Sequence, residues 1–165
     1  MDDTEREERF MELLRPCQQG AERFAISLVN DREDARDVLQ DAIIIVWRKF
    51  DDLKDPAAFK SYLFTILANL VRRRSRTTRR LTPLSEEHSE GIEATAPQPD
   101  THTDSVIVRE ALDRLSPKAR EAVILYEIQD LSVKEIAKIQ RSSVSAVKVR
   151  LFRARKQLMT ILRVD

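Results

Sequence analysis

The chain has 165 residues, of which 42% are apolar and 35% are charged, and its formal net charge is +1. This apolar share excludes a wholly disordered chain, and the length suits two small domains better than one large core. The single cysteine, Cys17, excludes an internal disulfide framework; with no export leader and no run of about 18 apolar residues, the sequence predicts a cytoplasmic protein.

The composition predicts an all-α fold, because Leu, Ala, Arg and Glu are abundant and only two glycines could serve hairpin turns. Charge is divided into blocks along the chain. Residues 1–55 hold 9 basic and 15 acidic residues, whereas residues 106–165 hold 13 basic and 7 acidic ones. This segregation says more about binding partners than the total charge does.

The first predicted helix with a distinctive surface runs from about Asp31 to Phe50. Residues 42–47 are all apolar and four of them are β-branched, so by propensity alone they could form a buried strand. We predict a helix, because the sequence offers no second strand for pairing. A helical projection places on the core side Ala35, Val38, Leu39, Ala42, Ile43, Val46 and Phe50.

The opposite side of this helix carries polar residues around an isoleucine. It is either a solvated face with one stray apolar residue or a protein-binding face with an apolar anchor, and we favour the second interpretation. The candidate binding residues are Asp37, Gln40, Asp41, Ile44 and Arg48, with Trp47 at the edge.

The next predicted helix, from about Ala57 to Arg76, follows a helix-start signal at Asp55-Pro56. It is expected to bury Phe59, Leu63, Ile66, Leu67 and Leu70, and its other side aligns Ser61, Thr65, Asn69, Arg72 and Arg76, with Arg73 beside them. Six arginines within residues 72–80 exceed what a helix dipole needs, although dipole compensation is the alternative. We therefore predict nucleic-acid contact, with the small polar side chains on bases and the arginines on phosphates.

Residues 81–105 contain six acidic residues, three prolines and no basic residue. Such a segment cannot bury enough apolar surface to order itself. We predict a flexible acidic linker here, between a helical domain at residues 1–80 and a second one at residues 106–165.

The second domain carries a predicted helix-turn-helix. Ser132 and Glu135 fit a capping box, so we expect a short helix over 132–139, a turn over 140–142 and a longer helix over 143–158. The longer helix should bury Val144, Val147, Leu151, Ala154 and Leu158, and it faces outward with Ser145, Lys148, Val149, Phe152, Arg153 and Lys156. Residues 136–164 contain eight basic residues and no acidic one, which favours a DNA reader over a basic helix of a simple bundle.

The sequence has no pattern typical of an enzyme. It lacks a glycine-rich phosphate loop, a histidine paired with a nucleophile and a metal-ligand spacing, so we expect neither a catalytic site nor a cofactor.

Across nearly its whole length the chain resembles bacterial RNA polymerase sigma factors of the extracytoplasmic-function (ECF) type. Residues 34–47 resemble the helix of region 2 that binds the polymerase clamp, and residues 59–76 resemble the segment that melts the promoter and reads the minus-10 element. Residues 115–120 and 135–155 resemble region 4, which reads the minus-35 element. The order of these motifs, with a linker in place of a middle domain, is highly specific.

The resemblance implies a dissociable promoter-specificity subunit that is monomeric when free and leaves the chemistry to the polymerase. It implies as partners core RNA polymerase, through the clamp of the β′ subunit and the flap of the β subunit, promoter DNA, and an anti-sigma factor. Tyr62 stands where a tryptophan is usual, and Arg73 where an aspartate is common. Arg141 and Ser145 stand where turn glycines are common, so the turn must form without a residue that takes positive φ at little cost.

Two other functions are open to the same sequence. A stand-alone helix-turn-helix regulator would bind its operator tightly without polymerase. A polymerase-binding adaptor would never contact bases, and it would tolerate loss of Phe152 and Arg153.

Overall fold

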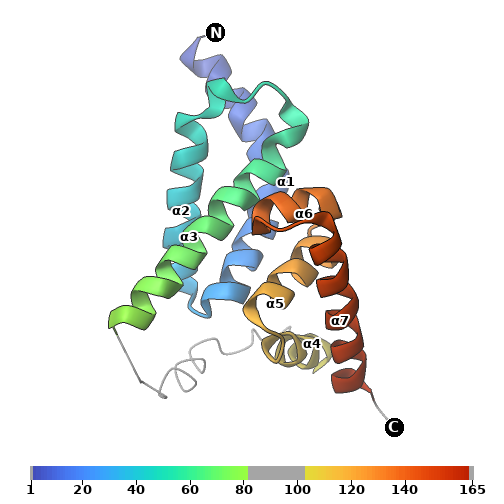
Figure 1. Ribbon diagram of the computed structural model, residues 1–165. Coiled ribbons are helices and arrows are strands. Elements are labelled where there is room, and N and C mark those ends of the chain that lie inside the picture. Colours follow the sequence, from blue (N-terminus) through green and yellow to red (C-terminus); the bar gives the residue numbers. More distant parts are fainter. Residues whose placement is uncertain (1, 82–102, 164–165) are drawn as a thin grey trace. The chain divides into compact units, whose positions relative to one another are not determined.

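The computed structural model describes residues 2–81 and 103–163 of the chain (Figure 1). Every regular element in these two ranges is a helix, which confirms the predicted all-α fold. The helices form two compact units, which are described separately below. Within the described ranges, no helix combines the length and the apolar character needed to cross a membrane.

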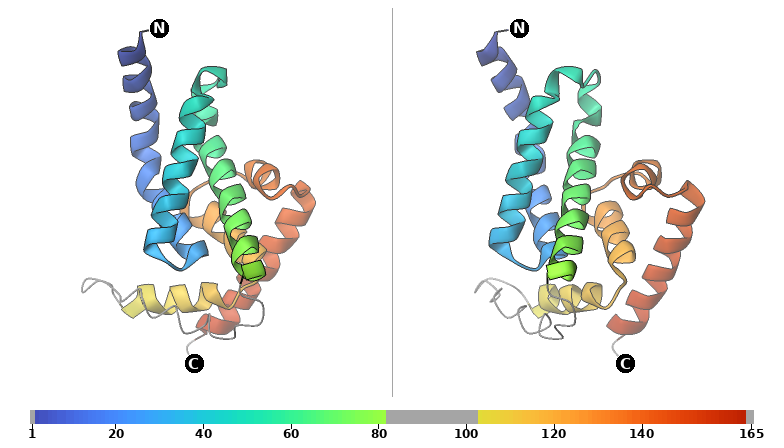
Figure 2. Two further views of the ribbon diagram at one scale, coloured as in Figure 1. Left: turned by 90° about the vertical axis from the view of Figure 1, so that its left-hand side faces the viewer. Right: turned by 60° about the vertical axis from the view of Figure 1, so that its left-hand side comes forward.

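The first unit is a bundle of three long helices, each packed against the other two (Figure 1, Figure 2). They are α1 (Asp3–Val29), α2 (Arg32–Arg48) and α3 (Phe59–Leu81), and two short 3₁₀ turns, η1 (Phe50–Asp52) and η2 (Pro56–Ala58), connect α2 to α3. Asp55 caps η2 by accepting a hydrogen bond from the Ala57 N–H at 3.0 Å, as the Asp-Pro start signal predicted.

Aromatic rings fill one end of this bundle. The Phe10 ring lies edge-on to the rings of Trp47, Phe50 and Phe59, with centroids 5.0, 5.3 and 5.6 Å away. Each such pair adds about 0.5–1.5 kcal/mol beyond the burial of its apolar area. These contacts fix the end of α2 and the start of α3 against α1.

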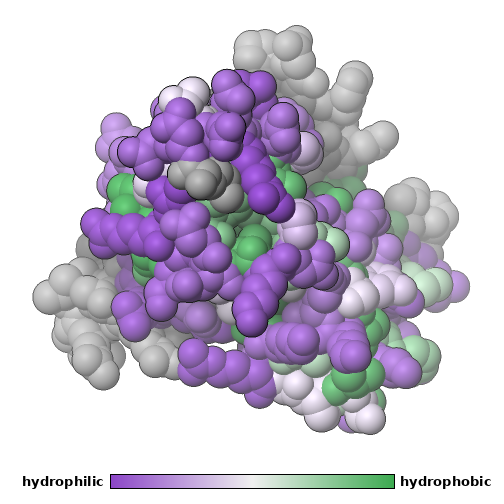
Figure 3. All heavy atoms as spheres, turned by 90° about the horizontal axis from the view of Figure 1, so that it is seen from above, coloured by the Kyte–Doolittle hydropathy of each residue, from purple (hydrophilic) through white to green (hydrophobic). Residues whose placement is uncertain are grey.

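Hydrophilic side chains dominate the molecular face shown in Figure 3, where apolar atoms are visible only in small areas.

Helix α2 confirms the choice of helix over strand for residues 42–47. The Asp31 carboxylate caps it by accepting hydrogen bonds from the N–H groups of Glu33 and Asp34, at 2.8 and 3.2 Å. The helix ends at Arg48, two residues before the predicted end, because the chain tightens into η1 at Phe50.

The predicted buried stripe of α3 is partly wrong. Ile66 and Leu70 are only half-buried. Helix α3 packs against both α1 and α2, so its buried side is wider than the predicted stripe and points in a different direction. The buried residues of α3 are Phe59, Leu63, Phe64, Leu67, Ala68 and Val71. The helix also continues past Arg76 to Leu81, since no proline or glycine interrupts it before Pro83.

In the described part of the second unit, helices pack around the last one in the chain. They are α4 (Thr103–Asp113), α5 (Pro117–Val123), α6 (Val133–Gln140) and α7 (Val144–Leu162), and α5 runs on as a π-helical turn, η5 (Ile124–Ile128). Helices α4, α5 and α6 all pack against α7. The apolar residues buried between them include Leu125, Ile136, Ile139, Val147 and Leu151.

The predicted linker at 81–105 was too long at both ends. Leu81 still belongs to α3, and α4 already begins at Thr103, because an N-terminal helical turn can be polar while later turns supply the buried residues. Residues 82–102, which make up the rest of that prediction, lie outside the described residues.

The turn of the helix-turn-helix has a left-handed residue without a glycine. Arg141 follows α6 with φ 52° and ψ 43°. Its N–H donates to the Lys138 carbonyl at 3.3 Å, and the N–H of Ser142 donates to the Ala137 carbonyl at 2.9 Å. These are the two bonds of a Schellman helix end. A non-glycine residue in this conformation costs about 1–2 kcal/mol, so the surrounding contacts must hold the turn.

The capping box at the start of α6 gives a first prediction. The Ser132 hydroxyl accepts from the Glu135 N–H at 3.1 Å, and the Glu135 carboxylate accepts from the Ser132 N–H at 2.8 Å. Ser132→Ala should lower the free energy of unfolding of the second unit by about 1 kcal/mol, because it leaves an N–H of the first turn without a partner. Urea denaturation followed by circular dichroism measures this loss. Ser145→Ala, an exposed serine within α7, is the control, and an equal loss there would contradict the capping argument.

Candidate nucleic-acid and polymerase interfaces

The outward face of α7 holds all the residues of the helix-turn-helix that were predicted to read DNA. Ser145, Lys148, Val149, Phe152, Arg153 and Lys156 are all exposed. Phe152 exposes 60% of its surface and Val149 48%, which is unusual for large apolar residues on a packed helix. The Ser143 hydroxyl caps this helix by accepting from the Ala146 N–H at 3.1 Å. The exposed row combines apolar contact surface with positive charge.

Charge on this face is available for a ligand. Neither Lys148 nor Arg153 makes a hydrogen bond or ion pair with any other residue in the described ranges. The Lys156 ammonium lies 5.0 Å from the centre of the Phe152 ring, a cation–π contact that orders both side chains. Three cations therefore accompany the exposed apolar pair.

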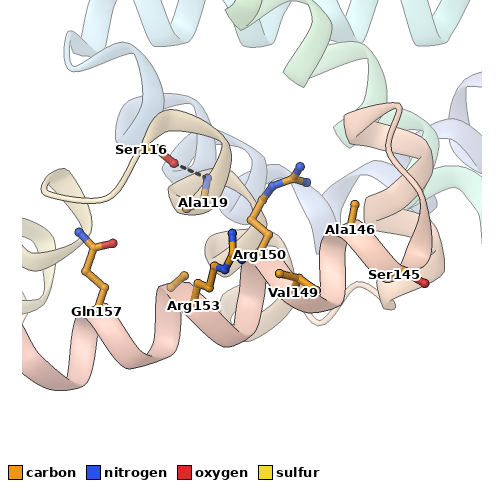
Figure 4. A pocket seen from close by; sticks show the side chains of 9 residues that line it. Ser116, Ala119, Ser145, Ala146, Val149, Arg150, Arg153 and Gln157 are labelled. Carbon is orange, nitrogen blue, oxygen red and sulfur yellow. Dashed lines mark hydrogen bonds between the residues drawn. The ribbon is translucent and has the colours of Figure 1, made fainter.

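A cleft of about 600 Å³ runs along this face, between α7 and the start of α5. It is lined by Ser116, Ala119, Ser145, Ala146, Val149, Arg150, Arg153, Ala154 and Gln157 (Figure 4). Arg153 and Val149 lie on its α7 wall, and at its α5 wall the Ser116 hydroxyl accepts from the Ala119 N–H at 3.3 Å. Its walls are basic, hydroxylic and apolar, the mixture that recognises phosphates and base edges.

The other arginines of α7 are held within the unit. Arg155 pairs with Glu127 at 2.6 Å and lies 5.2 Å from the centre of the Tyr126 ring, and its hydrogen bond to Glu127 raises the pKa of the guanidinium. Arg150 bonds Gln140 and Ser142. The sequence did not reveal these pairs, because the partners lie up to 28 residues away. The dense charge of the segment thus overstates the number of cations facing outward.

One predicted core residue of α7 is exposed. Val144 shows 39% of its surface, because it is the first residue of α7 and lies at the turn, before the helix is covered by its neighbours. Leu158 is half-buried, whereas Val147, Leu151 and Ala154 are buried as predicted.

The predicted protein-binding face of α2 is also exposed. Ile44 shows 40% of its surface, in a ring of exposed polar side chains: Asp37, Gln40, Asp41 and Arg48. None of these four forms an ion pair or side-chain hydrogen bond with a described residue. An exposed apolar side chain among polar side chains that have no partner in the described ranges fits a protein-binding surface better than a role in folding.

Trp47, at the edge of that face, is half-buried and packs against α1. The Arg6 guanidinium stacks 3.9 Å from the centre of its ring, and the Phe10 ring meets it edge-on. Arg6 also donates to the Trp47 carbonyl at 2.8 Å and to the Asp51 carboxylate at 2.9 Å. Arg6 therefore stabilises the C-terminus of α2. No local pattern marks Arg6 in the sequence, because 41 residues separate it from its partner.

The polar row of α3 is brought together as predicted by helical spacing. Ser61, Thr65, Asn69 and Arg72 are half-buried, and Arg73 is exposed. The Thr65 hydroxyl donates to the Ser61 carbonyl at 2.7 Å, and Arg72 donates to the Asn69 side-chain oxygen at 3.1 Å. The Asn69 amide nitrogen donates to no residue in the described ranges, so it can meet a base. Arg76 lies in α3, but its side chain lies outside the described residues.

A neighbouring arginine ties this helix to the start of α2. Arg74 donates to the Asp34 carbonyl at 2.8 Å and lies 3.8 Å from the Asp34 carboxylate. This pair holds the basic end of α3 beside the acidic start of α2. Because of these contacts with Asp34, Arg74 has a packing role and is not one of the candidate DNA contacts.

Comparisons with known proteins agree with this arrangement. The family model of sigma-70 region 2 matches residues 13–81, and that of sigma-70 region 4 matches residues 105–158. The ECF RNA polymerase sigma factor EcfG of Rhodopseudomonas palustris strain TIE-1 is 32% identical over 142 residues, which cover 86% of this chain and 78% of that protein.

Two solved structures have the same fold. The sigma factor RpoE, in complex with the anti-sigma factor NepR from Bartonella quintana, matches with a TM-score of 0.79 and 31% identity, covering 94% of this chain and 98% of that one. CnrH, in complex with the cytosolic domain of CnrY, matches with a TM-score of 0.66 and 28% identity, covering 93% and 86%. With a three-helix unit matched to region 2, a helix-turn-helix unit matched to region 4, and a relative of this identity and coverage, the chain belongs to the ECF family of RNA polymerase sigma factors.

Proposed function

We propose that this sigma factor divides promoter recognition between its two units, with α1–α3 acting at the minus-10 element and α4–α7 at the minus-35 element. The observation that carries the proposal is the outward face of α7, where Lys148 and Arg153 have no partner in the described ranges and flank the exposed Phe152. The segment between Leu81 and Thr103 would connect the two readers and, by its acidic sequence, follow a basic path through the polymerase.

At the minus-35 element, α7 would enter the major groove with the cleft of Figure 4 facing DNA. Arg153 suits the paired acceptors of a guanine edge, and Val149 and Phe152 suit thymine methyl groups. Ser145, Lys148 and Lys156 suit phosphates, which fix the register of the helix on the duplex.

Binding to core polymerase would use the exposed face of α2. Ile44 is the apolar anchor, and the surrounding Asp37, Gln40, Asp41 and Arg48 supply polar contacts to the clamp of the β′ subunit. Trp47 would act mainly by keeping α2 in place, through its contacts with Arg6 and Phe10. The second unit would bind the flap of the β subunit, so that one scaffold presents both readers at a fixed spacing.

At the minus-10 element, the row of α3 would hold the melted strand. Ser61, Thr65 and Asn69 offer hydroxyl and amide groups to bases, while Arg72, Arg73 and Arg76 supply the positive charge that attracts phosphates. Asn69 is central, because its side-chain oxygen is already oriented by Arg72 and its nitrogen is left for the strand.

Asn69→Ala should impair promoter melting more than initial polymerase binding. The alanine removes the base contact yet leaves the buried side of α3 intact, so we expect open-complex formation to fall by about tenfold, the value of one good base contact of about 1.4 kcal/mol. Permanganate footprinting measures melting, and a filter-binding assay measures the closed complex. Ser27→Ala, far from α3 in sequence and on α1, is the control; normal melting by the Asn69 variant would remove this residue from the minus-10 site.

Two consequences concern partners. The RpoE and CnrH matches are both complexes with another protein, and one of those proteins is an anti-sigma factor. We infer that an anti-sigma factor also binds this chain and covers the α2 and α7 faces. Without a partner the chain would be a monomer. Because its proposed partners are core polymerase and promoter DNA, we place the action of the chain in the cytoplasm. We assign it no catalytic reaction.

Run-off transcription with core polymerase on a genomic library tests the function as a whole. Sequenced start sites should share two elements, one near −10 and one near −35, and should disappear when the chain is omitted. Start sites that do not depend on the chain, or that share no upstream element, would contradict the proposal.

A further inference from the structure

Three helical segments of the second unit are joined by buried polar side chains. Gln140, the last residue of α6, is 4% exposed, and Glu121 of α5 is 5% exposed. The Gln140 amide nitrogen donates to the Glu121 carboxyl at 3.1 Å and to the Lys118 carbonyl at 2.9 Å. On its other side the Gln140 oxygen accepts from Arg150 of α7 at 2.5 Å. We call these residues the Gln140 network.

The amide of Gln140 has only one orientation that satisfies this network. Its nitrogen faces two acceptors and its oxygen faces a cationic donor, so a flipped amide would set oxygen against oxygen and nitrogen against nitrogen. Buried polar groups that lose their partners are costly, and a fully satisfied network selects one packing of the helices. The network therefore fixes α7 relative to α5 and α6.

Arg150 also reaches the turn of the helix-turn-helix. Its guanidinium lies 3.5 Å from the Ser142 hydroxyl, which in turn lies 3.3 Å from the Gln140 carbonyl. Ser142 follows Arg141, the residue held at positive φ without a glycine. One arginine of α7 thus bonds both sides of the strained position.

We propose that Arg150 is a positioning residue, which holds α7 and its turn in the DNA-reading orientation through Gln140 and does not itself bind DNA. This inference rests on the proposed minus-35 function of α7. It separates two arginines that lie side by side on the wall of the same cleft, since Arg153 has no partner in the described ranges whereas Arg150 is bonded inside the unit (Figure 4).

The test measures binding of full-length chain with core polymerase to a labelled promoter duplex, by fluorescence anisotropy over a range of salt concentrations. The same duplex with a scrambled minus-35 element gives the affinity ratio that reports minus-35 recognition. The variants are Arg150→Met, Gln140→Leu and their double combination, with Arg153→Met as the matched control on the same helix. Circular dichroism checks that each variant is folded.

Arg150→Met and Gln140→Leu should each lower the affinity ratio by about tenfold, because both release α7 from its orientation. The salt dependence should stay at the wild-type slope in both, and the double variant should be no worse than either single one. Arg153→Met should lower the ratio with little change of the slope, as expected for a lost base contact, because the slope reports phosphate contacts. Gln140 is the decisive position, because a buried residue cannot act by touching DNA.

A reduced salt slope for Arg150→Met, or a wild-type ratio for Gln140→Leu, would overturn the inference. If Gln140→Leu unfolds, the double variant Gln140→Met with Arg150→Met replaces both partners by apolar side chains and carries the same expectation. If the affinity ratio of the wild-type chain itself is near 1, the proposed minus-35 function fails. Normal Arg150 and Gln140 variants beside a defective Arg153→Met would leave the function standing and remove only the positioning role.

Discussion

Removal of Phe152 and Arg153 together is expected to abolish most minus-35-dependent transcription. Phe152→Ala with Arg153→Ala takes away an aromatic side chain that exposes 60% of its surface and a cation with no partner in the described ranges. A good base contact is worth about 1–3 kcal/mol, so we expect a joint loss of about 2.8 kcal/mol, or roughly 100-fold in promoter affinity. Both side chains point outward, so the fold should be unaffected.

The measurement is multi-round transcription from one promoter with an intact and with a scrambled minus-35 element. Arg155→Ala is the matched control, because it removes the same charge from the same helix but from the side that pairs with Glu127. It should change activity by less than about threefold, since exposed ion pairs contribute little. Full minus-35 dependence in the double variant would favour the adaptor interpretation, in which no base is contacted.

Ile44→Asp is expected to weaken binding to core polymerase by about 30-fold, equivalent to about 2 kcal/mol for an interface anchor. At 40% exposure the new carboxylate stays hydrated in the free chain, so the first unit should remain folded. In the complex it would lose its water beside Asp37 and Asp41. Biolayer interferometry with immobilised core polymerase measures the change.

An exposed isoleucine of the second unit provides the control for this substitution. Ile107 on α4 shows 47% of its surface, and Ile107→Asp should leave the contact made by α2 intact. Equal losses in both variants, or an unchanged affinity for Ile44→Asp, would count against α2 as the clamp-binding helix. Asp37→Ala and Gln40→Ala should produce smaller losses in the same direction.

Helical periodicity and capping predicted α2, α3, α6 and α7, whereas α1 and α4 were covered only by the all-α composition. The predicted capping residues Asp55 and Ser132 both accept the hydrogen bonds expected of them, because a cap depends on neighbours in sequence. The same local reasoning put Ile44 and Phe152 on outward faces, since one helix turns through a known angle per residue. The outward position of these two candidate residues was therefore predictable from the sequence.

Contacts between residues that lie far apart in the sequence could not be predicted from the sequence. Burial on α3 was misjudged at Ile66 and Leu70, because two neighbouring helices rather than one cover it. The stacking of Arg6 on Trp47 and the bond between Arg150 and Gln140 depend on which helices pack together. A charge count treats Arg150 and Arg153 alike, and only the packing tells them apart.

Positive φ at Arg141 shows why a missing glycine did not exclude the turn. The Schellman bonds satisfy the last carbonyls of α6, and Arg150 bonds both Gln140 and Ser142 around that residue. Contacts from outside the turn thus offset a local cost of about 1–2 kcal/mol. The sequence predicted a turn over residues 140–142, but it did not reveal the contacts from α7 that hold it.

We propose that two weak readers become one specific reader only on the polymerase. About three outward cations on α7 give a contact close to the nonspecific range of about 10⁻⁴ to 10⁻⁶ M, and joining two modules on one scaffold raises avidity by about 10²- to 10⁴-fold. A gel-shift titration of one promoter fragment, with and without core polymerase, tests this most directly. We predict no specific shift by the free chain below micromolar concentration and a specific shift once core is added, whereas nanomolar specific binding by the chain alone would contradict the account.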